Sequence, residues 1–240
     1  MQKNPLTIRG HLHRCWLFTW RAPVDSVRRH LPSVLTPTTH RGFAFWNAVV
    51  CEVRNLRPAP LPAWCGLSYW HVGYRIYVRA PLADGREIAG LYFVRSDCDR
   101  DIVARAGNVL TDFHFRVGEI RVSESGSRIW GDIRVAGANA NFELDRQATP
   151  ALSPGSPFAS LQDAEAALKY PPAGIATAGP NHLNVVRITR DEKAWRSRAI
   201  AAPRLDWQFF ADEPVTPELC FEVDPIDYQW NRGELLEVAR

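Results

Sequence analysis

Apolar and aromatic residues recur along the chain in short runs bounded by proline, glycine or charge. The first run, Leu12 to Trp20, predicts a buried strand that ends near Pro23. Pro23 then favours a short helix over Val24 to Leu31, because its fixed φ suits a first helical turn, and Pro32 ends that helix. Phe43 to Val53 predicts a second buried strand.

A hairpin is predicted in the next part of the chain. Its strands, Tyr69 to Arg79 and Glu87 to Arg95, are joined across Asp84-Gly85, a pair that tolerates positive φ. A helical stripe of apolar residues follows from Asp99 to Leu110. Further strands are expected at Phe113 to Val122, Arg128 to Val135, Asn141 to Leu144, Leu183 to Thr189, Trp207 to Ala211 and Leu219 to Val223, and a further helix from Ser160 to Leu168.

Many strands with a few short helices indicate an all-β or α+β protein built on a curved antiparallel sheet. The stretch 147–157 is rich in proline, serine, alanine and glycine and offers the only plausible boundary. We interpret it as a surface loop, so a single domain is expected over residues 1–240.

Composition narrows the class of protein. The chain has 29 Lys+Arg against 26 Asp+Glu, and a net charge of +3 is too small to predict nucleic-acid or membrane binding by bulk charge. No early apolar stretch is long enough for a signal peptide or a membrane span. Five cysteines without a CxxC pair argue against a disulfide framework, so we expect reduced thiols and a cytoplasmic location.

The predicted strand from Tyr69 to Arg79 has two different faces. Alternation places Trp70, Val72, Tyr74, Ile76 and Val78 on one face, which is apolar and belongs in a core. The other face carries His71, Gly73, Arg75, Tyr77 and Arg79. If that face looks into a cavity, Arg75 offers a bidentate fork to a carboxylate, with His71 and Tyr77 beside it. The alternative is a solvated outer face with surface ion pairs.

Polar residues in the following segments are weaker candidates. Asp97 could orient an arginine of the site, whereas Asp99 and Asp101 suit the first turn of the next helix. His114 and Arg116 share one side of their predicted strand and either join the polar cluster or are solvated.

Motifs for metal, cofactor or nucleophilic chemistry are weak or missing. His11 and His13 share one strand face and could ligate a metal, but no local third ligand accompanies them, so neither a metal nor a cofactor is expected. GxSxG, GxGxxG and GxxxxGK[ST] motifs are absent from the sequence.

An ordered series of segments resembles the uncharacterised bacterial YqjF-like family of the acetoacetate decarboxylase-like superfamily. The segments are Trp20-Arg21-Ala22-Pro23, His30-Leu31-Pro32, Phe45-Trp46-Asn47-Ala48-Val49-Val50, Tyr74-Arg75-Ile76-Tyr77-Val78-Arg79, Tyr92-Phe93-Val94-Arg95-Ser96-Asp97 and Asp112-Phe113-His114-Phe115-Arg116. The resemblance is diffuse but covers nearly the whole chain. It implies an α+β fold, mainly antiparallel β, in which an incomplete β-barrel with a few short helices surrounds a central cavity.

The sequence departs from acetoacetate decarboxylase itself at the reactive position. In that enzyme a Gly-Phe-Pro-Lys-Lys run supplies the Schiff-base lysine, whereas here Gly90 is followed by Leu91-Tyr92-Phe93-Val94. Phe93 therefore stands where the reactive lysine is expected, and His71 matches the enzyme's glutamate. None of Lys3, Lys169 and Lys193 lies near this segment, so imine-based decarboxylation is not expected.

The leading hypothesis is a protein that binds a small apolar carboxylate or ketone in a central cavity. Arg75 is the expected anion anchor, with His71, Tyr77, Asp97, His114 and Arg116 as polar neighbours. The alternative is a lyase or hydrolase that acts on a keto acid without an imine, with His71 as general acid/base near its ordinary pKa. A third possibility is an oligomeric scaffold whose cavity is filled by its own side chains; a homo-oligomer is compatible with each hypothesis.

Overall fold

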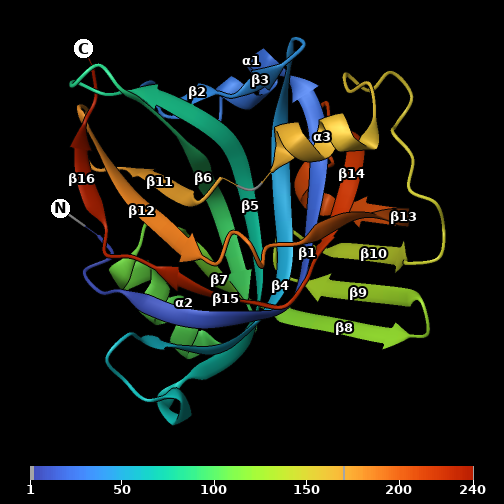
Figure 1. Cartoon of the computed structure of the whole chain (residues 1–240), viewed down its shortest axis with the longest axis horizontal. Coiled ribbons are helices and arrows are strands. Elements are labelled where there is room, and N and C mark those ends of the chain that lie inside the picture. Colours follow the sequence, from blue (N-terminus) through green and yellow to red (C-terminus); the bar gives the residue numbers. More distant parts are fainter. Residues whose placement is uncertain (1–2, 170, 240) are drawn as a thin grey trace.

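In a computed structural model, which describes residues 3–169 and 171–239, strands form most of the chain (Figure 1). The first half contains β1 (Ile8–Pro23), β2 (Thr36–Pro37), β3 (Thr39–His40), β4 (Phe43–Pro58), β5 (Leu67–Pro81), β6 (Glu87–Cys98), β7 (Phe115–Val117) and β8 (Glu119–Ser125). The second half contains β9 (Arg128–Arg134), β10 (Ala140–Asp145), β11 (Ala173–Thr177), β12 (His182–Arg190), β13 (Ser197–Trp207), β14 (Thr216–Val223), β15 (Ile226–Trp230) and β16 (Glu234–Glu237). The helices are α1 (Val24–Arg28), α2 (Asp101–Leu110) and α3 (Leu161–Leu168), with single 3-10 turns at η1 (Ala63–Cys65) and η2 (Gln208–Phe210).

The strand pairings close a ring. The order β4-β5-β6-β11-β12-β15-β1 returns to its start because β1 also pairs with β4. All of these pairings are antiparallel except that of β11 with β6. The sheet continues from β1 through β14 and β13 to β10, β9 and β8, which lie to one side of the ring (Figure 1). A mainly antiparallel α+β fold is therefore confirmed, and the ring corresponds to the expected incomplete barrel.

The long central strands are buried on both faces, which explains their nearly continuous apolar sequences. Strands β14, β13, β10, β9 and β8 are called the extension below. One face of β1, β4 and β5 packs against it, where Trp16, Val72 and Tyr74 join residues such as Ile133 and Phe142 in one core. The other face points into the ring and contributes to a second core. Both faces of the predicted Tyr69–Arg79 strand are consequently covered, apart from Arg79 near its end.

Local signals locate several elements well. The Asp84-Gly85 pair turns the hairpin between β5 and β6, with Gly85 at φ +83°. Ser160 caps α3, since its hydroxyl accepts a hydrogen bond from the Asp163 amide at 3.0 Å.

The expected strand over Phe113 to Val122 is wrong, because the chain changes its pairing partner within it. His114 has a left-handed φ of +55°, and the segment divides into β7, paired with β6, and β8, paired with β9. Gly118 lies between them, where a Cβ would come within 2.3 Å of Val135 Cγ2. Similarly, Trp207 ends β13 and the following residues form η2 rather than a strand.

Candidate functional site

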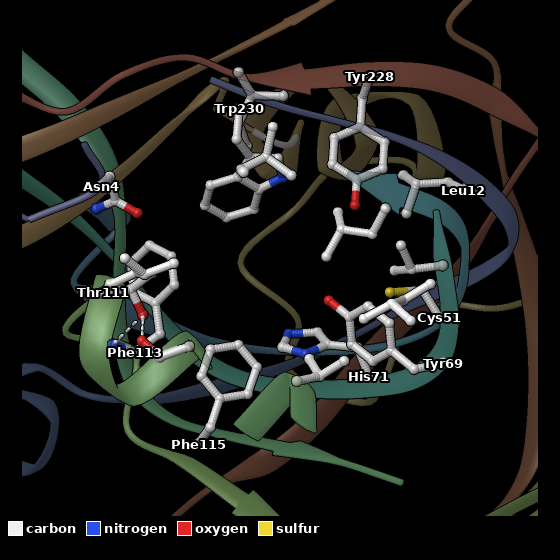
Figure 2. Close-up of a pocket in the computed structure, with 18 of the residues that line it drawn as sticks. Asn4, Leu12, Cys51, Tyr69, His71, Thr111, Phe113, Phe115, Tyr228 and Trp230 are labelled. Atoms are coloured by element: carbon white, nitrogen blue, oxygen red, sulfur yellow. Dashed lines mark hydrogen bonds between the residues drawn. The ribbon is translucent and has the colours of Figure 1, made fainter. Parts of the chain in front are cut away.

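A cavity of about 400 Å³ opens inside the ring (Figure 2). Residues of β1, β4, β5 and β6 line one part of its wall. Residues of α2, β7, β12 and β15, of the segment before β1 and of the loops after α2 and β12 line the rest. Side chains around it, including Leu12, Phe113, Phe115 and Trp230, leave an open centre (Figure 2). A scaffold whose own side chains fill the cavity does not match this arrangement.

Strand β5 carries three polar residues of the wall. Alternation turns Tyr69, His71 and Arg75 into the cavity, with Gly73 between the last two. Arg75 is only 1 % exposed, so this face of the strand is not solvated. The structure therefore places Arg75 on the cavity wall.

Arg75 is held on the cavity wall by contacts from its neighbours. Its Nη2 donates a hydrogen bond to Oδ1 of Asn47 on β4, and its guanidinium carbon lies 5.7 Å from the centre of the Phe93 ring. The Asn47 amide is neutral, so this hydrogen bond orients the guanidinium without cancelling its charge.

Tyr77 supports this arrangement from behind rather than lining the cavity. Its hydroxyl accepts a hydrogen bond from Nδ2 of Asn47 at 3.3 Å and donates one to the carbonyl oxygen of Leu168 at 3.1 Å. Asn47 is therefore fixed from both sides, by Tyr77 and by Arg75.

His71 lines the cavity on the same strand as Arg75. Its Nε2 is 3.0 Å from the point where a Cβ on Gly73 would stand, so the missing side chain makes room for the imidazole. The ring centre is 5.6 Å from that of Phe115, and Nδ1 is buried without a hydrogen-bond partner among the described residues. Burial, together with the positive charge of Arg75, lowers the pKa of His71 to about 3. The expected near-neutral pKa is wrong, and the imidazole is neutral at physiological pH.

Asp97 lies on the opposite face of the sheet from Arg75. It is paired in register with Val72, and its Oδ1 accepts a hydrogen bond from Nε of Arg95 at 2.7 Å. Burial raises the pKa of this carboxyl, and Arg95 acts in the opposite direction. Asp97 thus belongs to a buried ion pair outside the cavity wall.

His114 and Arg116 do not line the cavity either. Both are exposed, and the left-handed backbone at His114 interrupts the alternation that was expected to group them with the site. Of the predicted site residues, the structure brings His71 and Arg75 together at the cavity and places Tyr77 behind them.

Several lining residues were not singled out from the sequence. The hydroxyl groups of Tyr69 and Tyr228 point toward the open centre from opposite sides (Figure 2). Burial raises the pKa of Tyr69, which keeps its hydroxyl protonated. Arg190 also lines the wall, with its guanidinium carbon 3.6 Å from the centre of the Trp195 ring and Nε 2.8 Å from Glu192 Oε1. Tyr228 and Arg190 come from strands far along the chain, which local alternation cannot relate to β5.

Arginines are the charged residues of the described cavity wall. Its described residues include Arg57, Arg75 and Arg190 but neither a carboxylate nor a lysine. Phe93, at the position expected for a reactive lysine, is buried in the wall, whereas Lys169 is exposed beside Glu192 with Nζ 3.5 Å from its carboxylate. Such a wall can bind an anion, but its described side chains offer no amine for an imine.

His11 and His13 lie outside this cavity. Their ring centres are 6.1 Å apart, and Nδ1 of His11 is 2.7 Å from Oδ1 of Asp227. The described residues contain no cluster of three or more histidine, cysteine or acidic side chains arranged to hold a metal. No helix within the described ranges has the length and apolar character to cross a membrane.

Solved structures with the same architecture define the class of fold. An acetoacetate decarboxylase-like enzyme from Sphingomonas wittichii RW1 is 13% identical, with a TM-score of 0.62 over 98% of this chain and 94% of that one. The enduracididine biosynthesis enzyme MppR complexed with pyruvate is 14% identical, with a TM-score of 0.60 and coverage of 98% and 91%. Acetoacetate decarboxylase from Legionella pneumophila subsp. pneumophila str. Philadelphia 1 is 12% identical, with a TM-score of 0.56 and coverage of 94% and 86%. The chain therefore has the acetoacetate decarboxylase-like fold.

At the level of sequence, a family model matches residues 10–222. The chain belongs to this family, DUF2071, whose description is "Uncharacterized conserved protein (COG2071)". Comparison with curated proteins finds no match. The predictions of an uncharacterised family and of an acetoacetate decarboxylase-like fold are confirmed.

Proposed function

We propose that this protein binds a small organic carboxylate or keto acid in the central cavity, without forming a Schiff base. The observation that carries the proposal is the composition of the described wall, which has three arginines but no acidic side chain and no lysine. An anion that enters is attracted by an arginine such as Arg75, and an amine-dependent reaction has no described nucleophile there.

Arg75 is the proposed anchor for the carboxylate. Arginine carries a planar guanidinium cation whose fork of N–H donors matches the two oxygens of a carboxylate. Asn47 and Phe93 restrict its position, so little side-chain freedom is lost when a ligand binds. A charge-assisted hydrogen bond in such a buried site contributes about 1.5–3 kcal/mol.

The neutral His71 and the hydroxyl groups of Tyr69 and Tyr228 supply the remaining polar contacts in this proposal. Each can donate or accept a hydrogen bond and therefore suits a ketone oxygen as well as a carboxylate. A structural relative, MppR, has been solved with pyruvate, which supports a ligand of this chemistry.

Ligand-induced changes in Tm test the proposal. Pyruvate, acetoacetate and benzoate should each be titrated against the wild type, with at least one of them raising Tm in a saturable manner. Arg75→Met should weaken the binding of that ligand by about 10- to 100-fold, which is the effect of losing one charge-assisted hydrogen bond. Arg79→Met is the matched control, because Arg79 is on the same strand but its side chain is 47% exposed and lies outside the cavity.

Three outcomes count against this function. If no carboxylate changes Tm, or if Arg79→Met weakens binding as much as Arg75→Met, the anchor is wrong. If borohydride treatment with a ketone ligand leaves a covalent lysine adduct, the non-imine mechanism is wrong.

The alternative of a lyase or hydrolase with His71 as general acid/base receives less support. A group with a pKa of about 3 is unprotonated at neutral pH and is a poor proton donor there. Turnover of a keto acid that His71→Ala abolishes, while carboxylate binding is retained, would favour this alternative.

A further inference from the structure

The length and lining of the cavity carry information about its ligand beyond the carboxylate. Alternate residues of β5 follow the wall from Leu67, which is 37% exposed at the opening, through Tyr69 and His71 to Arg75, which is 1 % exposed. The strand advances by eight residues from Leu67 to Arg75, and at about 3.3 Å per residue this corresponds to a path of at most ~26 Å. A carboxylate held by Arg75 therefore lies at the inner end, and a three-carbon acid leaves most of the cavity unfilled.

The wall next to the proposed anchor is aromatic. Phe93, whose ring is 5.7 Å from the Arg75 guanidinium carbon, stacks on Phe113 with ring centres 4.2 Å apart. Trp230 continues this surface, with its ring centre 5.4 Å from that of Phe113. Carbon atoms attached to a bound carboxylate thus meet aromatic rings from the start.

Apolar contacts continue from these rings to the opening. Aliphatic side chains of β1 and β4 line the cavity, among them Leu12, Leu17, Val49 and Val53. At the outer end Leu6, Leu67 and Ile102 also line it while being 47%, 37% and 60% exposed. A mainly apolar path, bordered by Tyr69 and His71, therefore connects the anchor with solvent.

The other two cationic residues of the wall have different roles. Arg57 donates hydrogen bonds to the carbonyl oxygens of Asn55 and Leu61 at 2.9 and 3.1 Å, and Arg190 is ion-paired with Glu192. Neither arrangement divides the apolar path with an isolated charge.

We infer that the ligand is a carboxylic acid with an extended hydrophobic tail, either a medium-chain alkyl acid or an arylalkanoic acid, bound with its head at Arg75 and its tail toward Leu6, Leu67 and Ile102. This inference rests on the proposed function and adds the class of ligand. A cavity of about 400 Å³ falls in the range that holds ligands much larger than pyruvate.

A chain-length series measured by calorimetry with the full chain tests the inference. The series runs through pyruvate, butyrate, hexanoate, octanoate and decanoate, with 4-phenylbutanoate as the aryl arm and decanol as a ligand without a carboxylate. We expect Kd to tighten about fourfold with each added methylene until the tail reaches the opening. Decanol should bind at least tenfold more weakly than decanoate. Tighter binding of either tail type than of butyrate supports the inference, and their ranking distinguishes alkyl from aryl ligands.

Variants at the opening locate the tail. Ile102→Glu should weaken the binding of decanoate about tenfold and leave the Kd of butyrate unchanged, because only the longer tail reaches that residue. Val109→Glu is the matched control on the same helix, since Val109 is 71% exposed and does not line the cavity. Both positions are exposed, so neither change is expected to prevent folding.

The outcomes separate the inference from the proposed function. If pyruvate and decanoate bind equally well, the long tail is wrong while the carboxylate site stands. If decanol matches decanoate, the carboxylate head is wrong. If none of the acids binds, the proposed function fails as well.

Discussion

His71 and Arg75 share one face of β5, and Arg75 affects the protonation of His71. The guanidinium charge adds to burial in holding the imidazole neutral, and Gly73 provides the space in which the two lie close together. An acid bound at Arg75 offsets that positive charge. His71 is therefore best understood as a neutral hydrogen-bonding group whose protonation depends on what the arginine binds.

This coupling predicts a dependence of stability on pH. The folded-state pKa of His71, about 3, lies below its ordinary value of 6.5. The unfolded chain therefore binds the proton more readily between these values. The stabilisation is fully present above pH 6.5 and is lost as the pH falls toward 3. We expect His71 to lower the free energy of unfolding by about 1–2 kcal/mol at pH 5 relative to pH 8.

Urea denaturation at each pH measures this effect. His71→Gln should remove that part of the pH dependence, whereas His114→Gln should leave it unchanged because His114 is exposed. An identical pH profile in the wild type and His71→Gln would show that the imidazole is not buried in the way described.

The cysteines are also distinguished at the scale of single residues. Cys51 and Cys15 face each other across β4 and β1, and the hydrogen bond between their thiols, with burial, raises the pKa of Cys51 well above its ordinary value. Cys65 is half-buried on η1, outside both cores. We expect iodoacetamide at pH 7.5 to modify Cys65 at least tenfold faster than Cys51.

Intact-mass measurements over time follow this reaction. One adduct per chain should form before any other, and Cys65→Ser should abolish this fast phase. Early modification of Cys51 in the folded protein would mean that the cavity wall opens readily to solvent.

At the scale of elements, neighbouring strands of the extension fit closely because a large side chain on one strand lies over a glycine on the next. Gly131 on β9 lies beneath the ring of Phe142 on β10, and a Cβ at this position would be only 2.0 Å from Phe142 Cε1. The aromatic ring thus covers a strand position that has no side chain.

Gly131→Ala should therefore destabilise the protein by about 1–3 kcal/mol, because Phe142 is 2% exposed and has little room to move. The midpoint of urea denaturation measures the loss. Ser123→Ala on the neighbouring β8 is exposed and should have little effect. Equal stability of Gly131→Ala and the wild type would contradict the tight packing.

Local sequence signals predicted the elements that local chemistry determines. The Asp84-Gly85 turn and the Ser160 cap are examples, since each depends on a few adjacent residues. The division of Phe113 to Val122 into β7 and β8 could not be predicted in this way. It depends on Gly118 meeting Val135 and on which strand each half pairs with.

The same contrast applies to the candidate site. Alternation along one strand was enough to place His71 and Arg75 on a common face. It could not show that Asp97 belongs to the opposite face, because an irregularity in the register between Tyr74 and Arg75 changes how β5 and β6 align. Tyr228 and Arg190 join the site only through the closure of the ring, which is a property of the whole chain.

At the scale of the whole molecule, β1 closes the ring by pairing with β4 on one side and with β15 and β14 on the other. The pairs Ile8↔Trp230 and Cys15↔Val223 join residues more than two hundred positions apart. Such contacts give the fold a high contact order, which slows folding. During synthesis β1 cannot form these pairings until the chain beyond residue 216 has been made. The cavity is therefore among the last parts of the protein to form on the ribosome, and until then the apolar surfaces of β1 are open to chaperones and to aggregation.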